Sequence, residues 1–273
     1  MPDSPPITIR PLASLAEYRA AVDLQYVVWG AGLTDVTAAT ILKIGQRIGG
    51  VSAGAFDAAG ALLGFVFGLT GVEHGRVVHW SHMLAVRPEA QNRAIGRRLK
   101  EFQYAEVARV GAELIYWTYD PLVARNAHLN FNRLGVRVVE YVRDMYGDMG
   151  STLTAGIGTD RFVVAWPVGP AALAARRAEI ATASADPEFA AAPVLNPALG
   201  EALQRAPVAA GASRVRVRVP ADVGALQASD PAAAARWRAD TRAAIELALA
   251  AGYRVAGFAP GAAPEPAHYL LAV

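Results

Sequence analysis

The sequence predicts an α/β protein, and three observations support this fold class. Strand-like runs alternate with helical runs along residues 7–167. Within them, residues 84–98 pattern as a strand that leads through a short turn into an amphipathic helix. A second, shorter series of a strand, a helix and two strands lies in residues 213–273.

The composition excludes several classes of site. The 273 residues contain no cysteine, which excludes disulfides, thiolate metal sites and an acyl-cysteine intermediate. A net charge of only +2 does not favour nucleic-acid binding. No run approaches the roughly 18–20 apolar residues of a membrane span, and the N-terminus lacks the pattern of a secretory signal. We therefore expect a cytoplasmic protein without a membrane segment.

Residues 1–168 are expected to form the main domain. Its strands are expected over residues 7–10, 51–56, 61–69, 76–86, 113–118, 136–141 and 162–166. Its helices are expected over residues 15–29, 36–48 and 122–134, and from Ile95 onward with Ile95, Leu99, Phe102 and Ala105 on one face. Gly135 ends one helix as a C-cap, and the turn at residues 57–60 predicts a hairpin.

The C-terminal part divides into a connection and a small extension. Residues 169–212 are rich in Ala and Pro, which is typical of a linker or a loosely helical connection. In the extension, residues 213–273, we expect strands over 214–219, 253–258 and 268–273 and a helix over 231–251. The apolar stripe of that helix contains Ala234, Trp237, Thr241, Ile245 and Ala248.

The turn that starts the helix at Ile95 is a candidate anion cradle. The first turn of a helix leaves backbone N–H groups without intrahelical partners, and the helix dipole adds partial positive charge there. The amides would come from Gln91, Asn92, Arg93, Ala94, Ile95 and Gly96. Gly96 permits close approach of a phosphate, and Arg93, Arg97 and Arg98 add charge. The alternative is a well-capped surface helix.

This turn resembles the pyrophosphate-binding motif of the GNAT superfamily of acyl-CoA-dependent N-acyltransferases. That motif reads Gln or Arg, two residues, Gly, one residue, then Gly or Ala, and this sequence has Gln91-x-x-Ala94-x-Gly96. Ala94 replaces the first Gly, and its amide stays available to a phosphate if its φ is negative. The resemblance covers residues 7–167. It implies a mixed sheet flanked by helices, in the order strand, two helices, three strands, helix, strand, helix, two strands.

The resemblance also implies that acetyl-CoA, or another acyl-CoA, is the co-substrate. Its pyrophosphate would bind residues 91–97, and its pantetheine would pair with the backbone of Leu84, Ala85 and Val86. A strand amide near Leu84 would stabilise the thioester oxyanion.

A second signature of the family is a helix after the fifth strand that lines the pantetheine and thiol. Aligned on Gly135, its Ala and Tyr fall on Ala127 and Phe131, and its Asn falls on Ala124, with Asn126 displaced. The resemblance therefore assigns Asn126 and Phe131 to the cofactor. Phe131 lacks the hydroxyl that protonates the leaving thiolate in many relatives.

Polar side chains after the fifth strand are candidates for recognising the acceptor. They are Asp120, Arg125, Asn126 and Asn130, which should gather where the fourth and fifth strands splay. The alternative is helix capping and solvated surface. Residues 117–131 and the run Thr159-Asp160-Arg161-Phe162 resemble a poorly characterised bacterial branch of the superfamily.

Two histidines are candidate general bases. His79 and His82 lie on the strand that enters the cradle, on opposite faces because side chains alternate. At most one should therefore face the thioester, and Asp120 is the further candidate. The alternative for each histidine is a hydrogen-bonded core residue. Two histidines without a neighbouring Asp, Glu or Cys fall short of a zinc site, so no metal is expected.

These observations predict an acyl-CoA-dependent N-acyltransferase that acts on a small-molecule or peptide amine, and a homodimer is compatible with them. The alternative is an acyl-CoA-binding sensor or scaffold with reduced catalysis. A dinucleotide-binding domain is excluded because Gly-x-Gly-x-x-Gly is absent. The order strand, helix, strand, strand in the extension resembles the second half of a GNAT domain. The extension is therefore interpreted as a degenerate half-copy of that domain, which extends the first sheet. Its Arg214, Arg216 and Arg218 either form a solvated strand face or meet a phosphate or an acidic partner.

Overall fold

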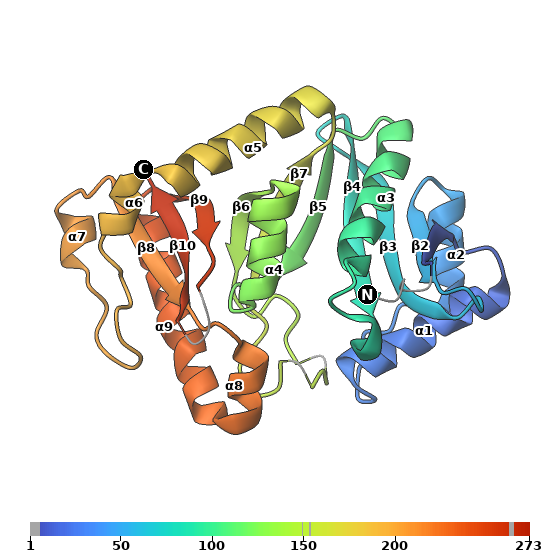
Figure 1. Cartoon of the computed structure of the whole chain (residues 1–273), viewed down its shortest axis with the longest axis horizontal. Coiled ribbons are helices and arrows are strands. Elements are labelled where there is room, and N and C mark those ends of the chain that lie inside the picture. The colour runs from blue at the N-terminus through green and yellow to red at the C-terminus, as the bar shows by residue number, and fades with distance from the viewer. Residues whose placement is uncertain (1–5, 149, 153, 262–264) are drawn as a thin grey trace. The chain divides into compact units, whose positions relative to one another are not determined.

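The structure is a computed structural model that describes residues 6–148, 150–152, 154–261 and 265–273 (Figure 1). The chain forms two compact units. The first contains residues 1–117, 148–153 and 167–169, and the second contains residues 118–147, 154–166 and 170–273. The chain passes from one to the other inside strand β5 (Leu114–Tyr119). The domain boundaries expected after residues 168 and 212 stay predictions.

The first unit is built on an antiparallel sheet. Its strands are β1 (Thr8–Pro11), β2 (Val51–Phe56), β3 (Leu62–Glu73), β4 (Arg76–Val86) and the first residues of β5. β1 to β4 pair antiparallel in sequence order, and β5 pairs parallel with β4. The expected hairpin at residues 57–60 is confirmed. Asp57 accepts hydrogen bonds from the N–H groups of Ala59 and Ala61, and Gly60 has a φ of +84°.

Helices cover both faces of this sheet. They are α1 (Leu15–Trp29), α2 (Ala39–Arg47) and α3 (Ile95–Arg109), with the 3-10 turn η1 (Pro88–Ala90) before α3. Phe67 of β3 lies in a buried cluster with Leu24 of α1, on one face. A Cβ at Gly64 would lie 3.3 Å from both Ile95 and Leu99, so α3 packs closely on the other face.

The second unit contains strands β6 (Arg137–Val142) and β7 (Arg161–Pro167), which pair antiparallel, and a separate three-stranded sheet. β7 and β6 are the last two strands of a seven-stranded sheet with the order β1-β2-β3-β4-β5-β7-β6. Before it, α4 (Ala124–His128) continues as a π-helical segment, η2 (Leu129–Leu134). Gly135, at a φ of +85°, ends this segment as expected.

The three-stranded sheet has the order β8-β10-β9 and is antiparallel throughout. Its strands are β8 (Arg214–Val219), β9 (Arg254–Ala259) and β10 (Ala267–Ala272). The accompanying helices are α5 (Pro170–Ala185), α6 (Pro187–Ala191), α7 (Ala206–Ala209), α8 (Val223–Ser229) and α9 (Pro231–Ala250). Among the described residues, no helix combines the length and the apolar character that crossing a bilayer requires.

The expectation that the extension continues the first sheet is wrong. β8, β9 and β10 form a sheet of their own. The outer edge of β8 is occupied by residues 193–196, because the N–H of Arg216 donates to Pro193 O and the N–H of Leu195 donates to Arg216 O. Residues 169–212, expected to be a linker or a loosely helical connection, contain the sixteen-residue helix α5.

The order of elements in residues 8–167 is the order that the resemblance implies. The buried faces of two helices differ from the expected ones. The buried residues of α3 are Ile95, Leu99, Lys100, Gln103 and Val107. Phe102 is only half-buried and Ala105 is exposed. In α9, Arg238 is buried, whereas Trp237 is half-buried. Apolar periodicity missed these positions because polar residues with internal partners occupy them.

Candidate functional site

Strand β4 parts from β5 at a β-bulge in the first unit. The β3–β4 register shifts between Phe67 and Gly68, which leaves His82 as the extra residue of β4. β4 and β5 pair only over residues 78–80. Along residues 81–86, β4 has no partner from β5 in the described structure. One edge of this stretch is therefore not paired by β5, and we call it the open side of β4.

Backbone alternation identifies the groups that point to this open side. The N–H of Arg87 donates to Leu63 O on β3 at 2.8 Å. Because successive residues of a strand point to opposite sides, the N–H groups of Leu84 and Val86 point away from β3. The side chains of these two residues approach the start of α3. A Cβ at Gly96 would lie 3.5 Å from Leu84 Cδ2 and 3.9 Å from Val86 Cγ2.

The turn between β4 and α3 alternates in backbone handedness. Asn92 has a φ of +62° and Ala94 a φ of +56°, whereas Gln91 has a φ of −64° and Ile95 begins the helix. Alternation of this kind directs neighbouring N–H groups into one concavity, a nest that binds anions. The N-cap position of α3 makes no side-chain hydrogen bond, because Ala94 occupies it. This end of α3 therefore lacks a side-chain cap, and the alternative of a well-capped surface helix stays a prediction.

The positive φ of Ala94 contradicts the condition under which its amide was expected to face a phosphate. An L-residue in this region costs about 1–2 kcal/mol because its Cβ crowds the following carbonyl. The motif that this turn resembles has Gly at this position. Ala94 adopts a left-handed backbone conformation that glycine would adopt at lower cost.

The arginines beside the turn differ in their contacts. Arg98 Nη2 donates to Ile7 O at 2.7 Å, so this side chain holds the chain before β1. The expectation that Arg98 adds charge to the cradle is therefore not met. Arg97 lies on the exposed face and forms an ion pair with Glu101 at 3.5 Å. Arg93 is half-buried in the turn itself.

A chain of hydrogen bonds between β3, β4 and α3 involves Thr70, His79, Ser81, Lys100 and Gln103, which we call the Lys100 cluster. His79 Nδ1 lies 3.0 Å from Thr70 Oγ1, and His79 Nε2 lies 3.0 Å from Gln103 Nε2. Lys100 Nζ donates to Ser81 Oγ at 2.7 Å and to Gln103 Oε1 at 3.2 Å. Neither ring nitrogen of His79 is open to a substrate.

Burial determines the protonation of this cluster. It lowers the pKa of His79 to about 3, with a further contribution from nearby Lys100. Burial also lowers the pKa of Lys100 far below the usual 10.5. The ammonium form would gain about 1–2 kcal/mol over the Trp117 ring, 3.8 Å away. Burying an unpaired charge costs more than that, so burial favours the neutral amine of Lys100 over its ammonium form.

His82 differs from His79 in both exposure and direction. It is exposed at the bulge, and its ring packs edge-on against Phe67 at 6.1 Å, on the face opposite to the Lys100 cluster. The expectation that the two histidines occupy opposite faces is confirmed. Desolvation by its neighbours lowers the pKa of His82, and the charge of Asp35 opposes this shift.

The residues predicted to contact the thiol end and the acceptor belong to the second unit. Arg125 is exposed and Asn126 is half-buried in α4, while Asn130 and Phe131 are buried in η2. The Phe131 ring packs T-shaped against Tyr269 at 6.1 Å, as a core residue does. Their assignments to cofactor and acceptor stay predictions.

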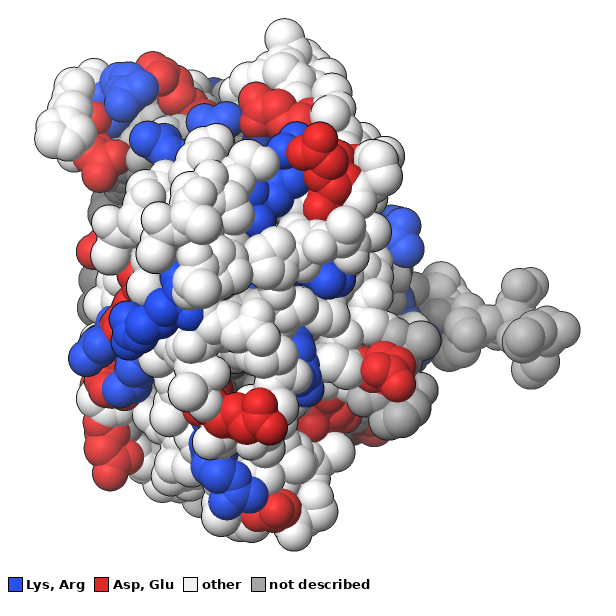
Figure 2. Space-filling view, turned by 90° about the vertical axis from the view of Figure 1, so that its left-hand side faces the viewer, with Lys and Arg blue, Asp and Glu red and all other residues white. Residues whose placement is uncertain are grey.

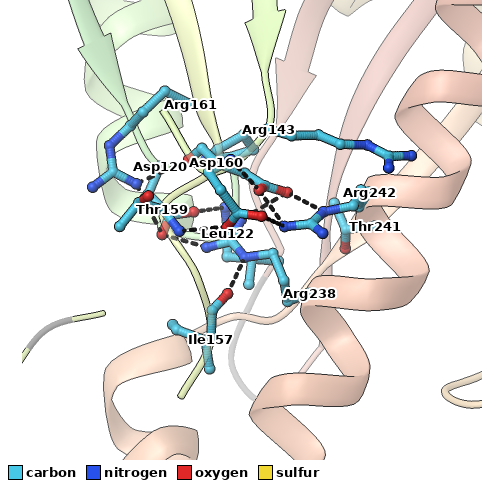
Figure 3. A network of polar contacts seen from close by, with 12 residues as sticks. Asp120, Leu122, Arg143, Ile157, Thr159, Asp160, Arg161, Arg238, Thr241 and Arg242 are labelled. Atoms are coloured by element: carbon cyan, nitrogen blue, oxygen red, sulfur yellow. Dashed lines mark hydrogen bonds and ion pairs between the residues drawn. The ribbon is translucent and has the colours of Figure 1, made fainter. Parts of the chain in front are cut away.

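Asp120 lies among arginines in this unit (Figure 3). Its Oδ1 accepts the N–H of Leu122 at 2.8 Å, which forms an Asx turn before α4. Its Oδ2 lies 2.5 Å from Arg238 Nη2 and 3.7 Å from Arg161 Nη1. The Asp120 carboxylate is thus engaged by two guanidinium groups.

Asp160 is fully buried beside it. It accepts hydrogen bonds from Arg242 at 2.5 and 2.8 Å, from the Tyr141 hydroxyl at 2.5 Å, and from the N–H of Asp144 at 3.1 Å. Burial alone would raise the pKa of Asp160, but the bonds from Arg242 and Tyr141 lower it. We call Asp120, Asp144, Asp160, Arg161, Arg238 and Arg242 the Asp160 network (Figure 3).

The Asp160 network balances three aspartates with three arginines and joins helix α9 to strand β7. Arg238 also donates from Nε to Ile157 O at 2.8 Å, so its buried guanidinium is well satisfied. Sequence reasoning singled out residues 159–162 only by resemblance and missed Arg238 and Arg242. Their signal was a pair of arginines four residues apart beside the apolar stripe of a helix.

No family model matches the chain, and no curated protein matches it. Similar solved structures include an acetyltransferase of the GNAT family from Streptococcus pneumoniae, with 15% identity, 60% of this chain and 100% of that chain covered, and a TM-score of 0.48. An acetyltransferase from Salmonella typhimurium with its cofactor acetyl-CoA has 18% identity, 60% and 94% covered, and a TM-score of 0.47. A GNAT phosphinothricin acetyltransferase from Sinorhizobium meliloti in complex with acetyl-CoA has 17% identity, 60% and 89% covered, and a TM-score of 0.46.

Proposed function

We propose that this chain is an acyl-CoA-dependent N-acyltransferase of the GNAT type, with acetyl-CoA as donor and the amine of a small molecule or peptide as acceptor. One observation carries the proposal. In the first unit, the open side of β4 leads directly into the nest at the start of α3. An acyl-CoA carries a pyrophosphate at one end and an amide-containing arm at the other, and this backbone offers a partner to each.

The pyrophosphate would bind the nest formed by residues 91–97, where backbone N–H groups and the helix dipole favour an anion. The pantetheine amides would pair with Leu84 and Val86, whose backbone groups point to the open side. Ala85, which was assigned to the same contact, points to β3 by the same alternation. Packing within the protein does not require a glycine at position 96, because a Cβ there would make only ordinary contacts. A glycine at this position therefore suits the close approach of a phosphate.

In the proposed reaction, the amine nitrogen attacks the thioester carbonyl carbon. The C–N bond forms, the C–S bond breaks, and the electron pair leaves on the CoA sulfur. His82 accepts the proton of the amine, since it is exposed at the bulge next to Leu84. The N–H of Leu84 stabilises the carbonyl oxygen, which is worth about 3–4 kcal/mol when the donor is well aimed. His79 is closed by its two hydrogen bonds.

The second candidate function is an acyl-CoA-binding sensor with reduced catalysis. Phe131 favours it, because this buried ring supplies no hydroxyl to protonate a leaving thiolate. The two candidates share the binding site and differ only in turnover. Release of free CoA from acetyl-CoA in the presence of a panel of amines separates them.

Binding is tested first, with Gly96→Asp. In the wild type, acetyl-CoA at 100 times its dissociation constant should raise the free energy of unfolding by about 2.7 kcal/mol, and NADH should have no effect. Gly96→Asp places a negative charge beside the nest and should abolish this shift while the fold is retained. Gly71→Asp is the matched control, since Gly71 has open space around it in the same unit. If acetyl-CoA stabilises Gly96→Asp as much as the wild type, the pyrophosphate does not bind at this turn.

Catalysis is tested with His82→Ala. We expect turnover to fall about 100-fold with little change in acetyl-CoA affinity, because a general base acts on the transition state. His74→Ala in the β3–β4 turn is the control and should keep wild-type turnover. If His82→Ala also keeps it, the base is water or Asp120.

A further inference from the structure

The three arginines of β8 do not form a uniform face. Arg214 is neutralised, because it pairs with Asp186 at 2.7 Å and with Glu188. Arg216 donates from Nε to the carbonyl of Ala192 at 2.9 Å and has no carboxylate partner in the described structure. The backbone N–H of Arg218 donates to Asn196 Oδ1 at 2.8 Å, whereas its buried side-chain Nε has no partner among the described residues.

Two further side chains complete this region of the second unit. His268 of β10 is paired in register with Arg218, so both side chains lie on the same face of the sheet. The Trp237 ring of α9 lies 5.1 Å from the Arg218 guanidinium. Burial lowers the pKa of His268 to about 4, and the charges of Arg216 and Arg218 lower it further. The three basic groups are therefore close enough to repel one another.

This lack of acidic partners contrasts with the Asp160 network of the same unit. There, each arginine has an aspartate within 4.0 Å. Arg216 and Arg218 have none in the described structure, yet both are half-buried, where an uncompensated charge is unfavourable. An external anion would satisfy the Arg218 side chain and compensate the charges of Arg216 and Arg218.

We propose that Arg216, Arg218 and His268 form a binding site for a phosphate group, either free phosphate or the phosphate of a small phosphomonoester. Guanidinium groups suit phosphate because they present pairs of parallel N–H donors to its oxygens. The half-buried positions of the three side chains suit a small ligand. On the face drawn in Figure 2, basic and acidic side chains are interspersed. Trp237 holds the plane of Arg218 by stacking.

The test is a titration of the full chain with inorganic phosphate, at constant ionic strength kept with sodium chloride. We expect a saturable rise in melting temperature and a saturable shift of the His268 ring protons in NMR spectra. Arg218→Gln should weaken phosphate binding at least tenfold. Arg214→Gln is the matched control on the same strand face and should bind as the wild type does, because its charge is already paired. Sodium acetate in place of phosphate should give no saturable shift.

Several outcomes would overturn the proposal. These are a shift that follows ionic strength alone, an unchanged affinity in Arg218→Gln, and an equal loss in Arg214→Gln. If Arg218→Gln does not fold, Arg216→Gln and His268→Gln replace it, and wild-type affinity in both would refute the site. A parallel titration with glycerol 3-phosphate identifies the source: tighter binding than phosphate supports a phosphomonoester, and weaker binding supports the free ion.

Discussion

Each unit buries a basic side chain, and the two units compensate it in different ways. Lys100 of the first unit contacts a hydroxyl, an amide oxygen and an aromatic ring, all uncharged. Arg238 of the second unit lies against Asp120 and Asp160. A lysine can lose its proton when it is buried, whereas an arginine keeps its charge. The first unit therefore buries neutral groups that can gain protons, and the second buries ions that must remain paired.

The largest effect is expected from breaking the ionic cluster. Asp160→Asn removes the charge that faces Arg242 and Arg238, so buried Arg238 and half-buried Arg242 would each lose a charged partner. We expect the free energy of unfolding to fall by about 3–5 kcal/mol, measured by urea denaturation. Glu246 lies on α9, as Arg238 and Arg242 do, and pairs with exposed Arg143. Glu246→Gln should cost less than about 1 kcal/mol. Equal losses would show that burial does not decide the strength of these pairs.

The second effect concerns His79 and acid. The folded protein holds His79 neutral down to about pH 3, whereas the unfolded chain takes up a proton below about 6.5. The unfolded state then binds more protons, so stability is complete above pH 6.5 and falls as the pH is lowered. We expect a loss of up to about 1.4 kcal/mol per pH unit from this group. The difference in unfolding free energy between wild type and His79→Gln should therefore change between pH 6.5 and 4.5. If the unfolding free energies of the two proteins change with pH in parallel, His79 is not held neutral in the folded state.

Lys100 predicts a third effect, at the other end of the pH range. Its pKa is lowered well below 10.5 in the folded state, so the unfolded state binds more protons between the folded pKa and about 10.5. Stability should rise with pH up to about 10.5, by at most about 1.4 kcal/mol per unit from this residue. Lys100→Met should lack this contribution, as urea denaturation at pH 7, 8 and 9 would measure. An identical pH dependence would mean that Lys100 keeps its proton over Trp117.

The smallest effect compares two left-handed backbone positions. Gly158 of the second unit adopts a φ of +73°, and a Cβ there would lie 2.5 Å from Asp144 Oδ1. Ala94 of the first unit adopts a φ of +56° without the freedom of glycine. Ala94→Gly should therefore raise the free energy of unfolding by about 0.5–1 kcal/mol, after the flexibility of glycine in the unfolded chain is subtracted. Gly158→Ala should lower it, and thermal unfolding checks both signs.

Local patterns predicted the elements whose signals are local. The helix over residues 15–29 and the strands over 51–56, 76–86 and 214–219 agree with the structure residue for residue. Each combines a regular apolar period with a clear stop, such as the Gly30 that follows α1. The turn at residues 91–96 was found because its N–H groups belong to consecutive residues.

What could not be predicted depends on contacts between distant residues. Lys100 and Gln103 are buried because they bond to residues of β4. Arg238 is buried because it pairs with Asp120, which lies 118 residues earlier in the chain. A periodicity that counts apolar residues assigns such side chains to the surface. Likewise, neither residues 193–196 nor β8 has a sequence pattern that predicts the pairing between them.

The open side of β4 also has a consequence for the protein on its own. Unpaired strand edges are templates on which another chain can add a strand, which is a common route to aggregation. Residues 81–86 include Met83, Leu84, Ala85 and Val86 and carry no acidic side chain to repel a second copy. A co-substrate lying along this edge would also shield it from other chains. Acyl-CoA should then act as a chaperone-like stabiliser that slows self-association of the protein on warming, independently of any turnover.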